Sequence, residues 1–183
     1  TEETILRLDG NGATLRAHKL HDSTPEHVNF TVRDRTTWEE FAKPKLLGVD
    51  RRRIPFESYR WAKQYSAERD LFYCWGGVAP FEQMHPLCGH EYMLMGMALD
   101  PDWVRDMADT YADLTIQHLE VLFSEEGAPD GFFFYEDMGF KQRPFMSPAM
   151  YAGILQPAHT RLFEYAHDNG CKVIVHSCGF VEP

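Results

Sequence analysis

The sequence predicts an α/β fold built around a parallel β-sheet. From residue 71 onward, short runs of aromatic and β-branched residues alternate with long segments that have helical periodicity. With 183 residues, 44% of them hydrophobic, the chain is long enough to form one domain with a substantial core. Strands that alternate with helices of this length favour a parallel sheet with right-handed crossovers, either doubly wound or closed into a barrel.

The chain begins with a predicted β-hairpin. Two apolar runs, Ile5–Leu8 and Ala13–Arg16, flank the sequence Asp9-Gly10-Asn11-Gly12. This combination of residues tolerates the positive φ angles of a tight turn.

Two helices are expected after the hairpin. Thr36-Thr37-Trp38-Glu39 has the pattern of a capping box, so the first helix should begin there and break near Pro44. Residues 57–68 have the pattern of a second helix with a polar face. We therefore treat residues 1–70 as an N-terminal hairpin and helical segment, and residues 71–183 as a series of strand–helix units.

The second segment contains three predicted strands: residues 71–75, 131–135 and 173–178. Three helices are predicted in this segment, and the first covers residues 81–99. The second starts at the cap Asp100-Pro101 and ends near Gly127. The third runs from the cap Ser147-Pro148 to Asn169, with a kink at Pro157.

Composition excludes several classes of protein. The net charge of −10 disfavours general binding to nucleic acids or to membrane surfaces, which both require clustered Lys and Arg. No apolar run approaches the length of a membrane span. Four cysteines are too few for a disulfide framework in a chain of this size, so we predict reduced thiols and a cytoplasmic location.

Polar side chains follow the ends of the predicted strands, where parallel α/β folds gather their chemistry. His176 and Cys178 lie on the same side of the last strand, and imidazole nitrogen and thiolate sulfur are preferred zinc ligands. The alternative is a histidine bonded to backbone beside an inert thiol, but the convergence of the strand ends favours the metal site. Glu136 and Asp137 could supply an oxygen ligand, a general acid or a substrate contact, or could have no functional role.

Further residues are candidates for the mouth of a pocket. Trp75 ends the first strand of the second segment, Glu82 begins the following helix, and Phe140 follows the predicted carboxylate pair. Trp75 and Phe140 would suit an apolar or aromatic substrate, although such residues more often serve packing. A cluster of His85, Cys88, His90 and Glu91 has metal-like spacing, but no strand end accompanies it, so a structural role is favoured.

Several motifs resemble the uroporphyrinogen decarboxylase superfamily. The most specific are Tyr135-Glu136-Asp137-Met138-Gly139-Phe140-Lys141, Phe145-Met146-Ser147-Pro148 and His176-Ser177-Cys178-Gly179. Weaker matches are Ser23-Thr24-Pro25-Glu26, Arg33-Asp34-Arg35 with Trp38, and Gly89 with Glu91 ahead of Asp100-Pro101.

The resemblance implies part of a (β/α)8 TIM barrel, because a whole barrel needs roughly 250 residues. At the site it is nearest to the zinc- and cobalamin-dependent methyltransferase branch, in which a His-x-Cys pair binds zinc with a third ligand supplied later in the chain. His176 and Cys178 match that pair, so the third ligand would lie beyond residue 183. The implied partners are a small methylated substrate or thiol and a corrinoid protein, and the resemblance also allows a homodimer.

Two alternatives remain at this point. A decarboxylase of the uroporphyrinogen type would act without a metal, but the arginine-rich motif of those enzymes has no match here, and an acidic chain is a poor host for a polycarboxylate. A non-catalytic binding module would leave the carboxylate pair and the His-x-Cys pair unexplained. The order of preference is methyltransferase, decarboxylase, binding module.

Overall fold

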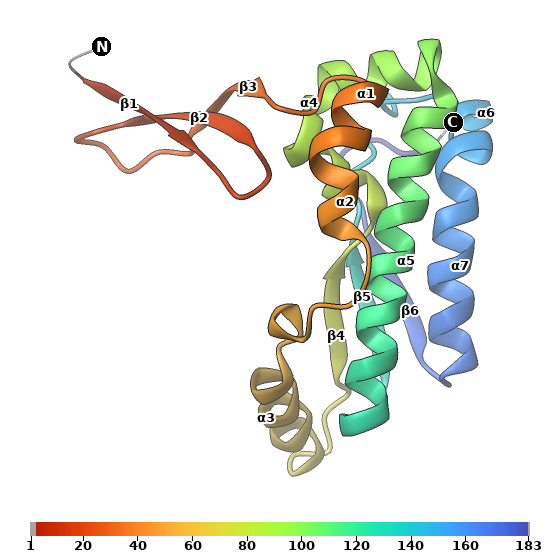
Figure 1. The fold of residues 1–183 in the computed structure, drawn as a ribbon. Coiled ribbons are helices and arrows are strands. Elements are labelled where there is room, and N and C mark those ends of the chain that lie inside the picture. Colours follow the sequence, from red (N-terminus) through yellow and green to blue (C-terminus); the bar gives the residue numbers. More distant parts are fainter. Residues whose placement is uncertain (1–2, 183) are drawn as a thin grey trace.

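The computed structural model describes residues 3–182, which form two separate three-stranded sheets (Figure 1). The first sheet is antiparallel, with the order β1 (Thr4–Leu8), β2 (Ala13–His18) and β3 (Glu26–Phe30). It extends away from the helical body of the molecule, and we call it the arm (Figure 1).

The arm contains the predicted hairpin and one strand that was not predicted. The Asp9 side chain accepts hydrogen bonds from the backbone N–H groups of Asn11 (2.9 Å) and Ala13 (2.8 Å), which fixes the turn between β1 and β2. Strand β3 pairs with β2 across a register shift between Thr14 and Leu15. Because β3 has polar residues and no continuous apolar run, its sequence did not indicate a strand.

The arm is joined to the body by short helical turns and one longer helix. These are α1 (Arg35–Thr37), the π-helical turn η1 (Trp38–Ala42), α2 (Lys43–Leu46), the 3₁₀ turn η2 (Arg51–Arg53) and α3 (Phe56–Ala67).

The predicted start of the first helix is wrong by two residues. Asp34 is the N-cap, and its side chain forms a reciprocal capping box with Thr37. The helical path also continues past Pro44, because this proline lies in the first turn of α2, where its missing N–H removes no helical hydrogen bond.

The second sheet is parallel, with the order β4 (Cys74–Val78), β5 (Gly131–Tyr135) and β6 (Lys172–His176). The body helices are α4 (Pro80–Leu99), α5 (Pro101–Glu126), α6 (Pro148–Met150) with the π-helical turn η3 (Tyr151–Leu155), and α7 (Gln156–Asp168). Strand β4 begins three residues later than predicted and includes both Gly76 and Gly77. The other two strands lie close to their predicted positions.

The prediction of a partial eight-stranded barrel is wrong. The described residues form an open parallel sheet of three strands and a separate antiparallel sheet of three strands, rather than a closed barrel. The alternation of strands and helices correctly indicated parallel pairing. It could not indicate closure, because closure depends on the number of strands and their shear rather than on local periodicity.

One face of the parallel sheet packs against the helices to form the core. Phe132 and Phe134 point to this face and are fully buried, as are Met107 and Leu119 of α5 and Leu162 of α7. Burial of a side chain of this size contributes about 1.5–3 kcal/mol to stability.

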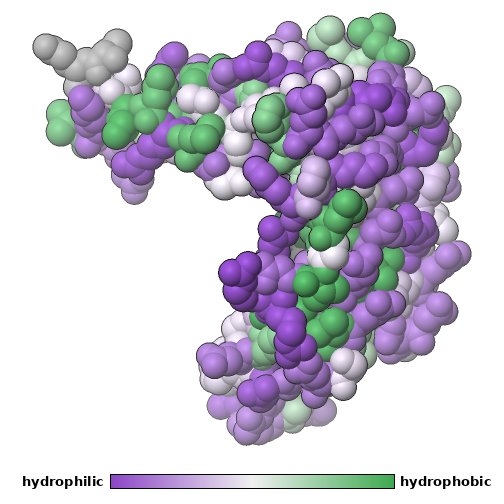
Figure 2. Space-filling view, viewed as in Figure 1, coloured by the Kyte–Doolittle hydropathy of each residue, from purple (hydrophilic) through white to green (hydrophobic). Residues whose placement is uncertain are grey.

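The opposite face of the parallel sheet is exposed. Val78, Tyr135 and Ile174 are all more than 40% accessible to solvent. In the view of Figure 2, hydrophobic side chains gather over the arm and along the hollowed side of the body below it. Within residues 3–182, no helix combines the length and the hydrophobicity required to cross a bilayer.

Candidate metal centre

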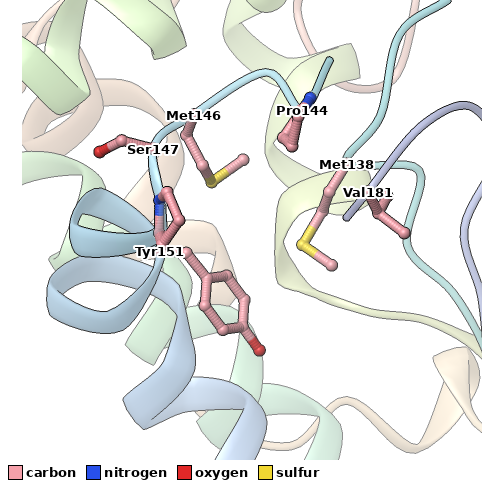
Figure 3. A pocket seen from close by; sticks show the side chains of 7 residues that line it. Met138, Pro144, Met146, Ser147, Tyr151 and Val181 are labelled. Carbon is pink, nitrogen blue, oxygen red and sulfur yellow. The ribbon is translucent and has the colours of Figure 1, made fainter. Parts of the chain in front are cut away.

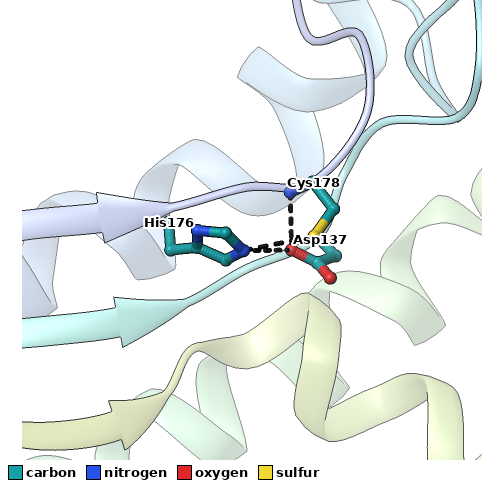
Figure 4. Close-up of side chains that lie close together, drawn as sticks. All are labelled: Asp137, His176 and Cys178. Atoms are coloured by element: carbon teal, nitrogen blue, oxygen red, sulfur yellow. Dashed lines mark hydrogen bonds and ion pairs between the residues drawn. The ribbon is translucent and has the colours of Figure 1, made fainter.

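Three side chains with metal-binding atoms meet beyond the carboxyl ends of β5 and β6. One ligand atom each from Asp137, His176 and Cys178 lies within 4.8 Å of the other two (Figure 4). The His176 Nε2 atom is 3.2 Å from Cys178 Sγ and 3.6 Å from Asp137 Oδ1. The backbone N–H of Cys178 donates a 2.6 Å hydrogen bond to Asp137 Oδ1.

The parallel pairing of β5 and β6 explains why these residues meet. His176 is the last residue of β6 and is in register with Tyr135, the last residue of β5. Asp137 and Cys178 each follow two residues later, so alternation returns both to the side of the sheet that Tyr135 and His176 share. The predicted proximity of His176 and Cys178 is confirmed, and Asp137 joins them.

The three atoms suit a zinc ion in their chemistry, and the two distances from His176 Nε2 suit it in spacing. Zinc takes nitrogen, sulfur and carboxylate oxygen ligands, and around a tetrahedral zinc these atoms lie roughly 3.3–3.7 Å apart. The distances of 3.2 and 3.6 Å are close to that range. Three protein ligands leave one tetrahedral position for an exogenous ligand, which is the arrangement of catalytic zinc sites.

The cluster is accessible to solvent, and Asp137 favours the protonated form of the Cys178 thiol. The side chains of His176 and Asp137 are 43% and 37% exposed, and Cys178 is also exposed. The Asp137 carboxylate raises the pKa of Cys178, chiefly through a side-chain hydrogen bond that the neutral thiol can make and the thiolate cannot.

The two loops that carry the ligands are in direct backbone contact. A Cβ atom on Gly139 would lie 2.7 Å from the Cys178 carbonyl oxygen, and a Cβ atom on Gly179 would lie 2.6 Å from the Gly139 carbonyl. A hydrogen-bonded bridge between Phe140 and Phe180 continues this contact, while Gly139 also bridges to Pro144 within its own loop. Only glycine allows the loops to approach so closely.

Glu82 lies near the cluster, in the first turn of α4. Burial raises the pKa of the Glu82 carboxyl to about 7, with further contributions from the charges of Asp137 and Glu136. Glu82 Oε2 is 3.5 Å from His85 Nδ1, and burial lowers the pKa of His85 to about 4. Glu82 is therefore close enough to the cluster to interact electrostatically with Asp137 and Cys178, and its role at a pocket mouth stays a prediction.

Glu136 points to the opposite side of the sheet from Asp137. Its side chain is fully buried, and it accepts hydrogen bonds from the backbone N–H groups of Phe81 (3.0 Å) and Glu82 (3.1 Å). It also contacts His159, which in turn contacts Tyr151. Neither His159 nor Tyr151 was singled out from the sequence. The available signal was a histidine on the buried stripe of α7, next to Ala158 and one turn before Leu162.

The structure separates Trp75 from the cluster and leaves Phe140 beside it. Trp75 pairs in register with Phe132, and its ring packs edge-on against Phe132 and Phe134 on the helix-covered face. Phe140 is 57% exposed and bridges to Phe180, two residues after Cys178. Phe140 therefore lies on the loop beside the cluster, whereas Trp75 packs in the core.

Two cavities lie near the site. An apolar cavity of about 240 Å³ is lined by Met138, Met146, Tyr151 and Val181, among others (Figure 3). A more polar cavity of about 390 Å³ lies where β3 meets α4, and His27, His85 and His90 line it. The ligand atoms of these histidines are too far apart to form a second metal cluster among the described residues.

Comparison of the chain with protein-family models, curated proteins and solved structures gives no significant match. The resemblance to the uroporphyrinogen decarboxylase superfamily therefore remains a prediction from the motifs, and the geometry of Asp137, His176 and Cys178 is the main guide to function.

Proposed function

We propose that this protein is a zinc-dependent methyltransferase in which Asp137, His176 and Cys178 hold the metal. The observation that carries the proposal is the convergence of oxygen, nitrogen and sulfur ligand atoms within 4.8 Å at an exposed strand end. Asp137 takes the place of the later ligand that the motifs imply.

The proposed acceptor is a small thiol. A free thiol has a pKa near 8.5, so most of it is protonated at neutral pH and is a weak nucleophile. Bound zinc would supply Lewis acidity, which lowers the pKa of a thiol in the open position. In the transfer, the thiolate sulfur attacks the methyl carbon, a new S–C bond forms, and the bond from the methyl group to its donor breaks with its electron pair left on the donor.

The residues of the chain have distinct roles in this proposal. Asp137, His176 and Cys178 fix the metal, Glu82 faces the acceptor, and the exposed ring of Phe140 borders the approach. The proposed methyl donor is a corrinoid carried by a partner protein, as the motif resemblance implies. A reducing compartment such as the cytoplasm would keep Cys178, which is unpaired in the structure, available as a ligand.

Zinc content is the first test of this proposal. We expect about one zinc per chain in the protein purified without chelators, and less than a tenth of that in Cys178→Ser, measured by elemental analysis. Cys74→Ser is the matched control, because it removes a thiol of the same sheet that lies outside the cluster. Zinc that is absent from the wild type, or unchanged in Cys178→Ser, would contradict the metal centre and favour a metal-free decarboxylase or a binding module.

Methyl transfer is the second measurement on the same samples. Methylcobalamin and a small alkyl thiol are mixed with the zinc-loaded protein, and loss of the methylated corrinoid is followed by its absorbance. We expect turnover that depends on both zinc and Cys178. If the zinc-loaded protein does not demethylate the corrinoid, the metal site would still stand, but the proposed methyl transfer would be refuted.

A further inference from the structure

We infer that Tyr151, His159 and Glu136 form a buried network that positions the ligands of the metal centre. This inference rests on the proposed zinc site and assigns the network a role in that site, without contact with substrate.

Glu136 is the centre of this network because both of its carboxylate oxygens are occupied. Oε1 accepts a hydrogen bond from the Phe81 N–H (3.0 Å) and lies 2.5 Å from His159 Nε2, while Oε2 accepts from the Glu82 N–H (3.1 Å). The side chain has no exposed surface. A group in this position cannot touch a substrate at the open strand end, so Glu136 is a positioning residue.

His159 connects Glu136 to the helices behind the sheet. It lies on α7, is 2% exposed, and its Nδ1 atom is 3.2 Å from the Tyr151 hydroxyl. Nε2 beside the Glu136 carboxylate carries a proton and donates to it, and the Tyr151 hydroxyl bonds to Nδ1, so both ring nitrogens have a partner.

The network joins the elements that carry the site. The backbone N–H of Glu136 donates to the His176 carbonyl (2.9 Å), and Asp137 is the next residue. The carboxylate of Glu136 binds the first turn of α4, which carries Glu82. Glu136 therefore links the three site residues: its backbone binds His176 and precedes Asp137, and its buried carboxylate, held in place by His159 and Tyr151, binds the turn that carries Glu82.

The Tyr151 hydroxyl offers the cleanest test of this dependence. The Tyr151 ring lines the apolar cavity next to Met138 and Met146, so Tyr151→Phe keeps the ring and removes only the contact with His159 (Figure 3). Tyr59→Phe is the matched control. Tyr59 is a buried residue of α3, and its hydroxyl donates a 2.7 Å hydrogen bond to the Gly127 carbonyl. Helix α3 lies at the end of the parallel sheet opposite the strand ends that carry the cluster (Figure 1).

The experiment uses Co²⁺ in place of zinc, because a cobalt thiolate gives visible and near-ultraviolet bands that report ligand geometry. We expect Tyr151→Phe to weaken Co²⁺ binding roughly 10-fold and to shift the bands, and His159→Leu to weaken it by up to roughly 100-fold. His159→Gln retains a donor toward Glu136 and should recover most of the affinity. Tyr59→Phe should leave affinity and spectrum unchanged, even if it lowers thermal stability as much as Tyr151→Phe does.

Two results would overturn the inference while leaving the zinc site intact: a Tyr151→Phe spectrum and affinity equal to those of the wild type, or an equal change in Tyr59→Phe. Failure of the proposed zinc site is distinguishable, because the wild type itself would then bind neither Co²⁺ nor zinc at the cluster, and the inference would fall with it. Failure of methyl transfer alone would leave both the metal site and this inference standing.

Discussion

In the absence of a metal, the Cys178 thiol keeps its proton beside the Asp137 carboxylate. The pKa of Cys178 is raised because the neutral thiol donates to the Asp137 carboxylate. Zinc binds the thiolate, so metal uptake must release this proton. Metal affinity should therefore increase as the pH rises toward the pKa of Cys178 and decrease in more acidic solution.

Alkylation of Cys178 tests this coupling at the level of a single residue. In the chelator-treated protein, Asp137→Asn removes the carboxylate that raises the thiol pKa, so the rate of reaction with iodoacetamide should begin to rise at lower pH. The thiolate fraction increases tenfold for each unit by which the pKa falls. A thiolate of lower pKa is also a weaker nucleophile, which cancels part of this gain in rate. The expected gain at neutral pH is thus about threefold per unit.

Mass spectrometry of the Cys178 peptide isolates this thiol from Cys88 and Cys171, which are buried. A pH–rate profile for Asp137→Asn that coincides with the wild type, or that moves to higher pH, would show that Asp137 does not hold the proton on Cys178.

The sequence predicted contacts between residues on the same strand, but it did not predict contacts that depend on how helices pack. His176 and Cys178 are two positions apart on one strand, so local geometry alone predicted their contact. The helix-side direction of Glu136 depends on packing against α4 and α7, which no local pattern specifies. The contact between Tyr151 and His159 spans η3 and the first turn of α7, where the π-helical turn changes the usual helical spacing.

Helix α4 changes direction at Gly89, and this kink determines how the arm meets the body. Gly89 has φ = 76° and ψ = 154°, a conformation that is essentially restricted to glycine. A Cβ atom there would lie 2.5 Å from the ring of Phe30, the last residue of β3. The kink therefore both bends the helix and makes room for the arm.

Gly89→Ala should destabilise the protein by about 1–3 kcal/mol, because alanine strains the backbone and also clashes with Phe30. Urea unfolding followed by far-ultraviolet circular dichroism measures the loss. Gly153→Ala is the matched control, since outside its own helical turn no atom lies within 4 Å of the added Cβ, and it should be neutral or slightly stabilising. Equal stability of the two variants would mean that the kink at Gly89 is not required.

At the level of elements, the strongest sequence signals located helices and strands well, and the errors have physical causes. The caps Asp100-Pro101 and Ser147-Pro148 are confirmed by hydrogen bonds from the backbone N–H groups of Trp103 and Met150. Strand β4 was placed too early because Gly76 and Gly77 have low strand propensity. Parallel pairing with the aromatic strand β5 overcomes that low propensity.

The two sheets of the molecule differ in how much core supports them. The parallel sheet packs against α5 and α7 and contains the fully buried Phe132 and Phe134. In the arm, Leu6 and Leu8 of β1 are 61% and 72% exposed. The arm should therefore open far more readily than the body.

Hydrogen exchange compares the central strand of each sheet directly. Strands β2 and β5 are each hydrogen-bonded to a strand on both sides, β2 in antiparallel and β5 in parallel pairing, and only β5 packs against a helical core. We expect the amides of β5 to exchange at least roughly 100-fold more slowly than those of β2, as measured by mass spectrometry on peptides that cover each strand. Similar protection in the two strands would show that the arm is stabilised by contacts beyond those in the structure.

The barrel prediction was wrong because closure of a sheet depends on the whole molecule rather than on any single segment. Each strand–helix unit was identified from its own residues, and such units look the same in an open sheet and in a closed one. Closure is a property of pairing between strands that are distant in sequence, and the three parallel strands found within residues 3–182 form an open sheet.

The direct backbone contact between Gly139 and Gly179 also affects how the site can evolve. Neither glycine offers a side chain to a metal or a substrate, yet any substitution at either position would push apart the loops that carry Asp137 and Cys178. These two positions should tolerate as little variation as the ligands themselves. New specificity would then have to arise in residues that border the site, such as Phe140, while the spacing of the ligand loops stays fixed.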